Sequence, residues 1–135
     1  MYLLDTNVLS ELRKGRRTHP GVRAWAASTA GERHFISVLS LGEIRKGIEI
    51  LRRKSPDQCA AFERWITRLE QDYEQDILPI SSSVAERWGR LTAARSLPVV
   101  DGLLAATALE YRLKVVTRNT VDFTGTGIEV VNPFE

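Results

Sequence analysis

Four acidic side chains stand at, or just beyond, points where a short apolar segment gives way to a helix or a turn. They are Asp5, Glu43, Asp101 and Asp122. Three of them follow apolar segments, and Glu43 lies on a predicted helix that leaves another such segment. In an open parallel sheet the carboxyl ends of the strands share one edge, where ligands bind. The pattern therefore predicts that the four carboxylates meet at one edge of a sheet.

Four neighbouring carboxylates repel one another, and a bound divalent cation relieves that repulsion. Hard oxygen ligands suit Mg²⁺, and Mn²⁺ accepts the same ligands. A cation in such a site activates water and stabilises the leaving oxygen when a phosphodiester bond is hydrolysed. The acids therefore favour metal-dependent phosphodiester hydrolysis.

Each acid also has a purely structural interpretation. Asp5 and Asp101 are both suited to cap the helix that follows them. Asp122 lies in the turn-rich segment 119–127. Glu43 is either an exposed helix residue or partly buried, and a buried Glu requires a partner. The joint position of the acids at strand and helix junctions, more than any one of them, indicates a site.

The hydrophobic pattern predicts strands that alternate with helices. Short apolar segments predict strands at 2–4, 34–37, 77–80, 114–117 and 128–131. Helical spacing predicts helices at 8–14 and 20–30, a hairpin over 37–76, a helix capped by Ser82 or Ser83 and closed by Pro98, and a helix at 102–111. Thr6 and Asp101 are the expected N-caps of the first and last helix. This order predicts a single α/β domain over residues 1–135, an α/β/α sandwich with a mostly parallel sheet.

The composition is that of a globular protein, with a net charge of only +2. The whole molecule is therefore not strongly attracted to nucleic acid. The basic side chains form two clusters: Arg13, Lys14, Arg16 and Arg17, and Arg52, Arg53 and Lys54. Either cluster alone is explained by solvated helix ends, and most of its members are Arg, which suits phosphate contacts.

The single cysteine, Cys59, rules out an internal disulfide and is typical of a reducing compartment. Its apolar neighbours predict a buried thiol that packs in the core. Asp5 interrupts the apolar N-terminal segment too early for a signal peptide. No apolar segment approaches the roughly 20 residues of a membrane span. We therefore expect a cytoplasmic protein with no membrane partner.

Five segments of the chain resemble a known family in their order and spacing. They are residues 4–12 (Leu-Asp-Thr-Asn-Val-Leu-Ser-Glu-Leu), 37–48, 101–108, 116–123 and 131–134. Together they span almost the whole chain. They resemble PIN-domain toxins of the VapC and FitB kind, the toxins of VapBC toxin–antitoxin pairs.

The resemblance implies a PIN domain, which has an α/β/α fold around a parallel sheet. It implies a Mg²⁺-dependent endoribonuclease that serves as the toxin of a type II toxin–antitoxin pair. RNA is then the substrate, and a cognate antitoxin and a second copy of the chain are the partners. Contact with DNA is implied only through the antitoxin.

The resemblance also implies roles for individual residues. Asp5, Glu43 and Asp101 match the first three acids of the family. We expect Asp5 and Asp101 to be the main metal ligands. Glu43 would ligate the metal directly or through water, and would help to orient the attacking water. Thr6 and Asn7 would hold the ligands in place by hydrogen bonds.

The fourth acid has two candidate positions. Many relatives carry an acid where Asn119 stands, and others rely on the acid where Asp122 stands. Asn119 brings no charge, although its amide oxygen can ligate a metal or orient a water. We therefore assign the fourth acidic role to Asp122 and a supporting role to Asn119.

Two alternatives come from other classes of protein. An aspartyl-nucleophile phosphatase would begin similarly at Asp5, but it needs a second acid where Asn7 stands and a well-placed lysine, and Lys114 lies inside a predicted strand. A PIN-like scaffold that only binds protein or nucleic acid would not need all four acids. EDTA separates the scaffold from the nuclease, because only the nuclease needs divalent ions.

Overall fold

A computed structural model describes residues 1–135 and contains one five-stranded sheet in which every neighbouring pair of strands is parallel. The strands are β1 (Tyr2–Leu4), β2 (His34–Ser37), β3 (Ile77–Leu78), β4 (Lys114–Val116) and β5 (Val130–Val131). Their order across the sheet is β3-β2-β1-β4-β5. All five predicted strands are present, and the sheet is parallel throughout. The carboxyl ends of the strands therefore share one edge.

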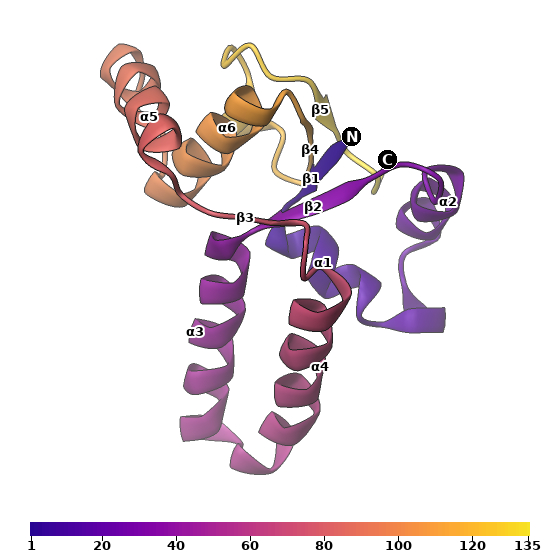
Figure 1. The fold of residues 1–135 in the computed structure, drawn as a ribbon. Coiled ribbons are helices and arrows are strands. Elements are labelled where there is room, and N and C mark those ends of the chain that lie inside the picture. Colours follow the sequence, from indigo (N-terminus) through magenta and orange to yellow (C-terminus); the bar gives the residue numbers. More distant parts are fainter.

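Helices cover both faces of the sheet. They are α1 (Thr6–Leu12), α2 (Pro20–Ser28), α3 (Val38–Lys54), α4 (Cys59–Asp72), α5 (Ser82–Ala94) and α6 (Val99–Tyr111), with short 3-10 turns η1 (Gly15–Arg17), η2 (Pro56–Gln58) and η3 (Val121–Phe123). Figure 1 shows α5 and α6 on one side of the sheet and α1 to α4 on the other. The predicted three-layer α/β/α sandwich is confirmed.

The strands are almost continuous apolar segments because an apolar core packs against each face of the sheet. Alternate side chains of a strand point to opposite faces of a sheet. Leu4 of β1 belongs to the core beneath α1 to α4, whereas Leu3 belongs to the core beneath α6. The same alternation separates Val116 from Val115 in β4. Because both faces are buried, the fully buried middle positions of the strands are apolar, and polar side chains such as His34, Ser37 and Lys114 lie at strand ends.

The hairpin of α3 and α4 projects away from the sheet and carries its own charge network (Figure 1). Arg45 and Arg52 of α3 both form ion pairs with Glu49 and with Glu63 of α4. The Arg45 guanidinium lies 2.8 Å from Glu63. Cys59 is buried, and its Sγ lies 3.8 Å from the Ile48 carbonyl oxygen. The predicted helical hairpin and the predicted packing thiol are both confirmed.

Helix α2 is fixed by a contact of Trp25 and by a contact at its N-terminal end. The Trp25 ring stacks on the His34 ring of β2, with centroids 5.2 Å apart. At the N-terminal end of α2, the main chain of the C-terminal residues passes close to Gly21. A Cβ at Gly21 would lie 2.5 Å from the Pro133 carbonyl oxygen, so only glycine fits there without displacement.

Several predicted helix boundaries are wrong. Asp5, not Thr6, is the N-cap of α1. Helix α6 begins at Val99 with Pro98 as its N-cap, so Asp101 lies inside the first turn and is not a cap. The Pro98 carbonyl accepts the first intrahelical bond, from the Gly102 N–H at 2.9 Å. The cap of α5 is Ser81, and α5 ends before the segment that contains Pro98. No helix is long and apolar enough to cross a bilayer.

Candidate metal centre

Asp5 leaves the carboxyl end of β1 and is almost fully buried, at 8% exposed. Its Oδ1 accepts a hydrogen bond from the Thr6 backbone N–H at 2.7 Å, which is the cap interaction. Its Oδ2 accepts bonds from the Thr117 hydroxyl at 2.8 Å and from Asn7 Nδ2 at 3.3 Å. Asp5 is therefore both a helix cap and a buried carboxylate at the sheet edge, so the two interpretations hold together.

Asp101 and Asp122 are brought together by Asn119. The Asn119 side-chain N–H₂ donates to Asp122 Oδ2 at 2.6 Å and, more weakly, to Asp101 Oδ2 at 3.4 Å. Asp101 comes from the first turn of α6, whereas Asn119 and Asp122 come from the turn after β4 and from η3. The two candidates for the fourth position thus contact each other, and both lie beside Asp101.

The pKa of Asp101 depends on the other acids of the cluster. The pKa of Asp101 is raised to about 6, and burial is the largest cause. A hydrogen bond with the Asp122 carboxyl group and the negative charges of Asp5, Asp122 and Glu43 contribute the rest of this shift. The structure therefore brings the other three predicted acids within electrostatic reach of Asp101.

Glu43 lies on the first turns of α3 and is exposed. Partial burial was one of its two expected environments, and the structure shows the other. The Thr6 hydroxyl donates a hydrogen bond to Glu43 Oε1 at 2.6 Å, which ties α3 to the start of α1. Glu43 is thus the most exposed acid of the cluster.

The donor set fits a hard divalent cation by its chemistry. All four acids and the Asn119 amide offer oxygen atoms, which are the ligands that hard divalent cations prefer. No three acidic, histidine or cysteine side chains are close enough to bind one ion as they stand. Hydrogen-bond donors from Thr6, Asn7, Thr117 and Asn119 hold the carboxylates instead.

Sequence reasoning missed Thr117. It directly follows β4 and is completely buried, and its hydroxyl contacts Asp5, Asn7 and the backbone of Asn119. A polar residue at the end of an apolar strand was the available signal. The same signal drew attention to Asp5 at the end of β1.

The phosphatase alternative fails on the position of its lysine. Lys114 begins β4 and pairs with Tyr2, the first residue of β1. It lies at the amino edge of the sheet, where its Nζ is 3.6 Å from Glu129. Asp5 lies at the opposite edge, so Lys114 cannot assist a nucleophile there.

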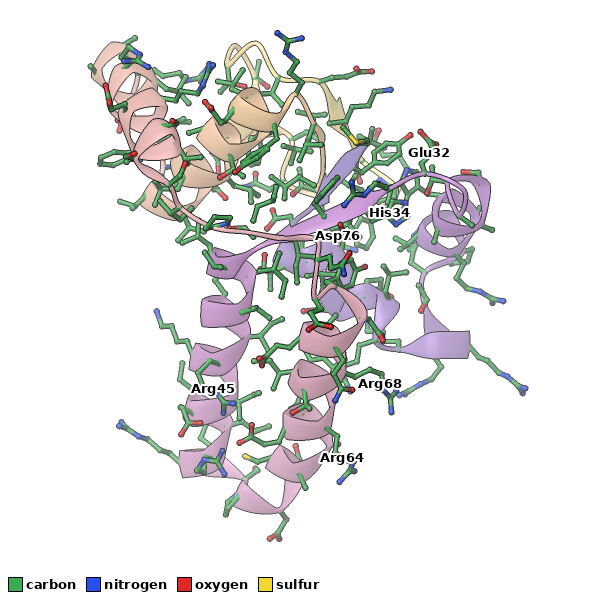
Figure 2. All side chains as sticks on the ribbon, in the orientation of Figure 1. Glu32, His34, Arg45, Arg64, Arg68 and Asp76 are labelled. Atoms are coloured by element: carbon green, nitrogen blue, oxygen red, sulfur yellow. The ribbon has the colours of Figure 1, made fainter.

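The basic residues differ in what they already contact. Arg52 of the second basic cluster forms ion pairs with Glu49 and Glu63. The Arg13 guanidinium lies 4.2 Å from the centroid of the Phe62 ring, as a cation–π contact. Arg64 and Arg68 project from α4 (Figure 2).

Residues 2–126 match the sequence model of the PIN domain. The chain belongs to the PIN-domain family. This PIN domain is 32% identical to the toxin FitB of Neisseria gonorrhoeae, over 99% of each chain. It is 30% identical to a VapC ribonuclease of Sinorhizobium fredii, over 100% of this chain and 99% of that one. The family resemblance seen in the five sequence segments is confirmed.

Solved structures agree with this PIN-domain fold over the whole chain. The crystal structure of FitAcB from Neisseria gonorrhoeae superposes with a TM-score of 0.81 at 30% identity, covering 100% of this chain and 99% of that one. A toxin–antitoxin complex from Klebsiella pneumoniae gives a TM-score of 0.70 at 29% identity, with coverage of 100% and 99%.

Proposed function

We propose that this PIN domain is a Mg²⁺-dependent endoribonuclease, the toxin of a type II toxin–antitoxin pair. The observation that carries the proposal is the series of hydrogen bonds through Thr117 and Asn119 that joins Asp5 to Asp101 and Asp122 at the carboxyl edge of the sheet. Glu43 is connected to the start of α1 by the Thr6 hydroxyl. The relatives named as a toxin and as a ribonuclease support it. Mn²⁺ is expected to replace Mg²⁺, because both accept the same oxygen ligands.

The position of each residue in the cluster indicates its role in the proposed reaction. Asp5, which is buried, and Asp101 would hold the cation, and Asp122 would complete the acidic cluster beside Asn119. The bound cation would lower the pKa of water and stabilise the leaving oxygen of the phosphodiester. Glu43, at the exposed side, is placed to orient the attacking water and to accept its proton. Thr6 fixes the direction of the Glu43 carboxylate.

RNA must approach the cluster from solvent, and Glu43 is the exposed acid of the cluster. Arg16 and Arg17 of η1 are exposed and are the members of the first basic cluster best placed to contact RNA phosphates. Such contacts would position the strand without reading its sequence.

The test of the function is cleavage of RNA by Asp5→Asn and Asp101→Asn variants under Mg²⁺. Each change keeps the shape of the side chain but removes an anionic ligand, so we expect cleavage to be lost while circular dichroism shows a retained fold. Asp57→Asn is the matched control, because Asp57 is exposed in η2, far along the hairpin. Full cleavage by both site variants would remove the assignment.

An antitoxin is the expected protein partner, and a groove beside the metal centre can receive it. The groove has a volume of about 320 Å³ and lies between α1, α3 and α4. Its lining is Thr6, Ser10, Glu43, Ile44, Gly47, Ile48, Leu51, Phe62 and Trp65. An apolar segment bound there would end beside Glu43 and obstruct the acids. We expect contact with DNA only through the antitoxin, and the related FitAB complex is bound to a DNA fragment.

Co-purification with the antitoxin tests the groove. A Cβ at Gly47 meets nothing within 4 Å, so Gly47→Phe places a ring in the groove without an internal clash of its backbone. We expect this variant to lose the antitoxin. Gly89→Phe is the control, because Gly89 is equally open but lies on α5. Equal recovery of antitoxin by both variants would contradict the groove.

A further inference from the structure

The Thr117 hydroxyl uses its entire hydrogen-bonding capacity at the sheet edge. A hydroxyl has one hydrogen to donate and two lone pairs to accept with. Asn7 Nδ2, at 3.1 Å, and the Asn119 backbone N–H, at 3.0 Å, can only donate to it. The single hydroxyl hydrogen must therefore point to Asp5 Oδ2, which lies 2.8 Å away. Because Thr117 is completely buried, water does not compete for these bonds.

Asn7 reinforces the same connection and has only one consistent orientation. Its Oδ1 accepts the Arg118 backbone N–H at 3.2 Å, while its Nδ2 donates to both Asp5 and Thr117. The two backbone N–H groups that follow Thr117 are thus both held by side-chain oxygens of this network. The turn after β4 is fastened to the end of β1.

The network then continues to the other two acids. Asn119, whose backbone is held by Thr117, uses its side chain to contact Asp101 and Asp122. An unbroken series of hydrogen bonds therefore joins Asp5 on β1 to the acids on α6 and η3. Thr117 is the only residue that contacts both Asp5 and Asn119.

We propose that Thr117 is a positioning residue, whose hydroxyl holds Asp5 in register with Asp101 and Asp122 and thereby sets the affinity of the site for a divalent cation. The proposal rests on the proposed metal-dependent function. Thr117 itself need not touch cation or substrate. The competing explanation is that Thr117 only fills space at the end of β4, in which case a side chain of the same shape would serve as well.

The test compares Thr117→Val with Thr117→Ser in the full chain. Valine keeps the shape and the preference for extended backbone but removes the hydroxyl, whereas serine keeps the hydroxyl. Thr107→Val is the matched control, because Thr107 is also completely buried and its hydroxyl bonds only to the Leu103 carbonyl within α6. Mn²⁺ binding is measured by calorimetry without RNA, and unfolding is followed in EDTA.

We expect Thr117→Val to bind Mn²⁺ about 10–100-fold more weakly, the usual cost of losing a residue that orients a ligand. Thr117→Ser should stay close to wild type, and so should Thr107→Val. If Thr117→Val fails to fold, Thr117→Ala provides the same loss of the hydroxyl with less crowding, and its affinity should fall similarly.

Three outcomes overturn the proposal, and they can be told apart. Wild-type affinity in a folded Thr117→Val or Thr117→Ala variant shows that the hydroxyl does not position Asp5, while the metal site stands. Equal loss in Thr117→Ser and Thr117→Val assigns the effect to packing and not to hydrogen bonding. Absence of Mn²⁺ binding by the wild-type chain removes the proposed function and this proposal with it.

Discussion

At the scale of single residues, Asp101 links the metal centre to folding stability. Burial and its acidic neighbours raise its pKa to about 6, above the ordinary value of 3.8. A carboxyl group whose pKa is higher in the folded state binds its proton more tightly there. Its contribution to stability is therefore fully present below pH 3.8 and is lost as the pH rises through about 6. The ionised Asp101 carboxylate therefore destabilises the fold at neutral pH.

Asp101→Asn should remove this penalty. In EDTA at pH 7 we expect the variant to melt at a higher temperature than wild type, and at pH 4 the difference should largely disappear. The measurement is the melting temperature, followed by circular dichroism between pH 4 and pH 7, with Asp57→Asn as the control. A variant that is less stable than wild type at pH 7 would show that Asp101 contributes more through its contacts than it costs through repulsion.

Asp122 and Asn119 can be separated by their different charges. Asp122→Asn removes an anion from the cluster, and the loss of one electrostatic contact in such a site is worth on the order of a hundredfold in rate. Asn119→Ala removes a neutral donor that contacts Asp101 and Asp122, so its cost should be smaller. The measurement is the cleavage rate against Mg²⁺ concentration. Wild-type behaviour of Asp122→Asn with an inactive Asn119→Ala would reverse the assignment.

At the scale of elements, the packing of the C-terminal residues on α2 depends on a missing side chain. Gly21→Ala would place a Cβ 2.5 Å from the Pro133 carbonyl oxygen, so the main chain must move. Overpacking of this kind typically costs about 1–3 kcal/mol. We expect a lower free energy of unfolding in urea, with the metal centre unaffected because α2 does not contribute to it.

Gly89→Ala is the matched substitution, and we expect it to raise the free energy of unfolding. Gly89 lies inside α5, and a Cβ there meets nothing within 4 Å. Alanine in a helix interior is more stable than glycine by roughly 0.5–1 kcal/mol. Destabilisation by both glycine substitutions would mean that the close approach to Pro133 is not the cause.

The elements also show which parts of the fold sequence reasoning can reach. Buried strands and amphipathic helices follow from periodicity, and these were predicted. The start of α6 was not, because Pro98-Val99-Val100 resembles the end of a strand, and only the tertiary fold places Val99 in a helix. The acids were found from their positions, but Thr117 was missed because its function depends on Asn7 and Asp5, which are brought near it only by the pairing of β1 with β4.

At the scale of the whole molecule, an uncovered apolar surface favours a homodimer. Val38, Ile50 and Val99 are 39%, 48% and 61% exposed, beside a hollow of about 520 Å³ between α3 and the start of α6. We predict a dimer by light scattering at micromolar concentration and a monomer for Ile50→Glu. Tyr111→Glu, at the other end of α6, should remain dimeric. A monomeric wild-type chain would contradict the prediction.

The position of β1 in the middle of the sheet has a consequence for how the protein is made. β1 is synthesised first, yet one of its two neighbours is β4, and Asp5 and Thr117 are 112 residues apart. At typical synthesis rates the ribosome needs roughly 6 to 20 seconds to cover that distance. Until then the Asp5 carboxylate has neither its hydroxyl donor nor the turn that carries Asn119 and Asp122. A nascent chain that stops short of residue 117 therefore has no assembled site with which to cut RNA.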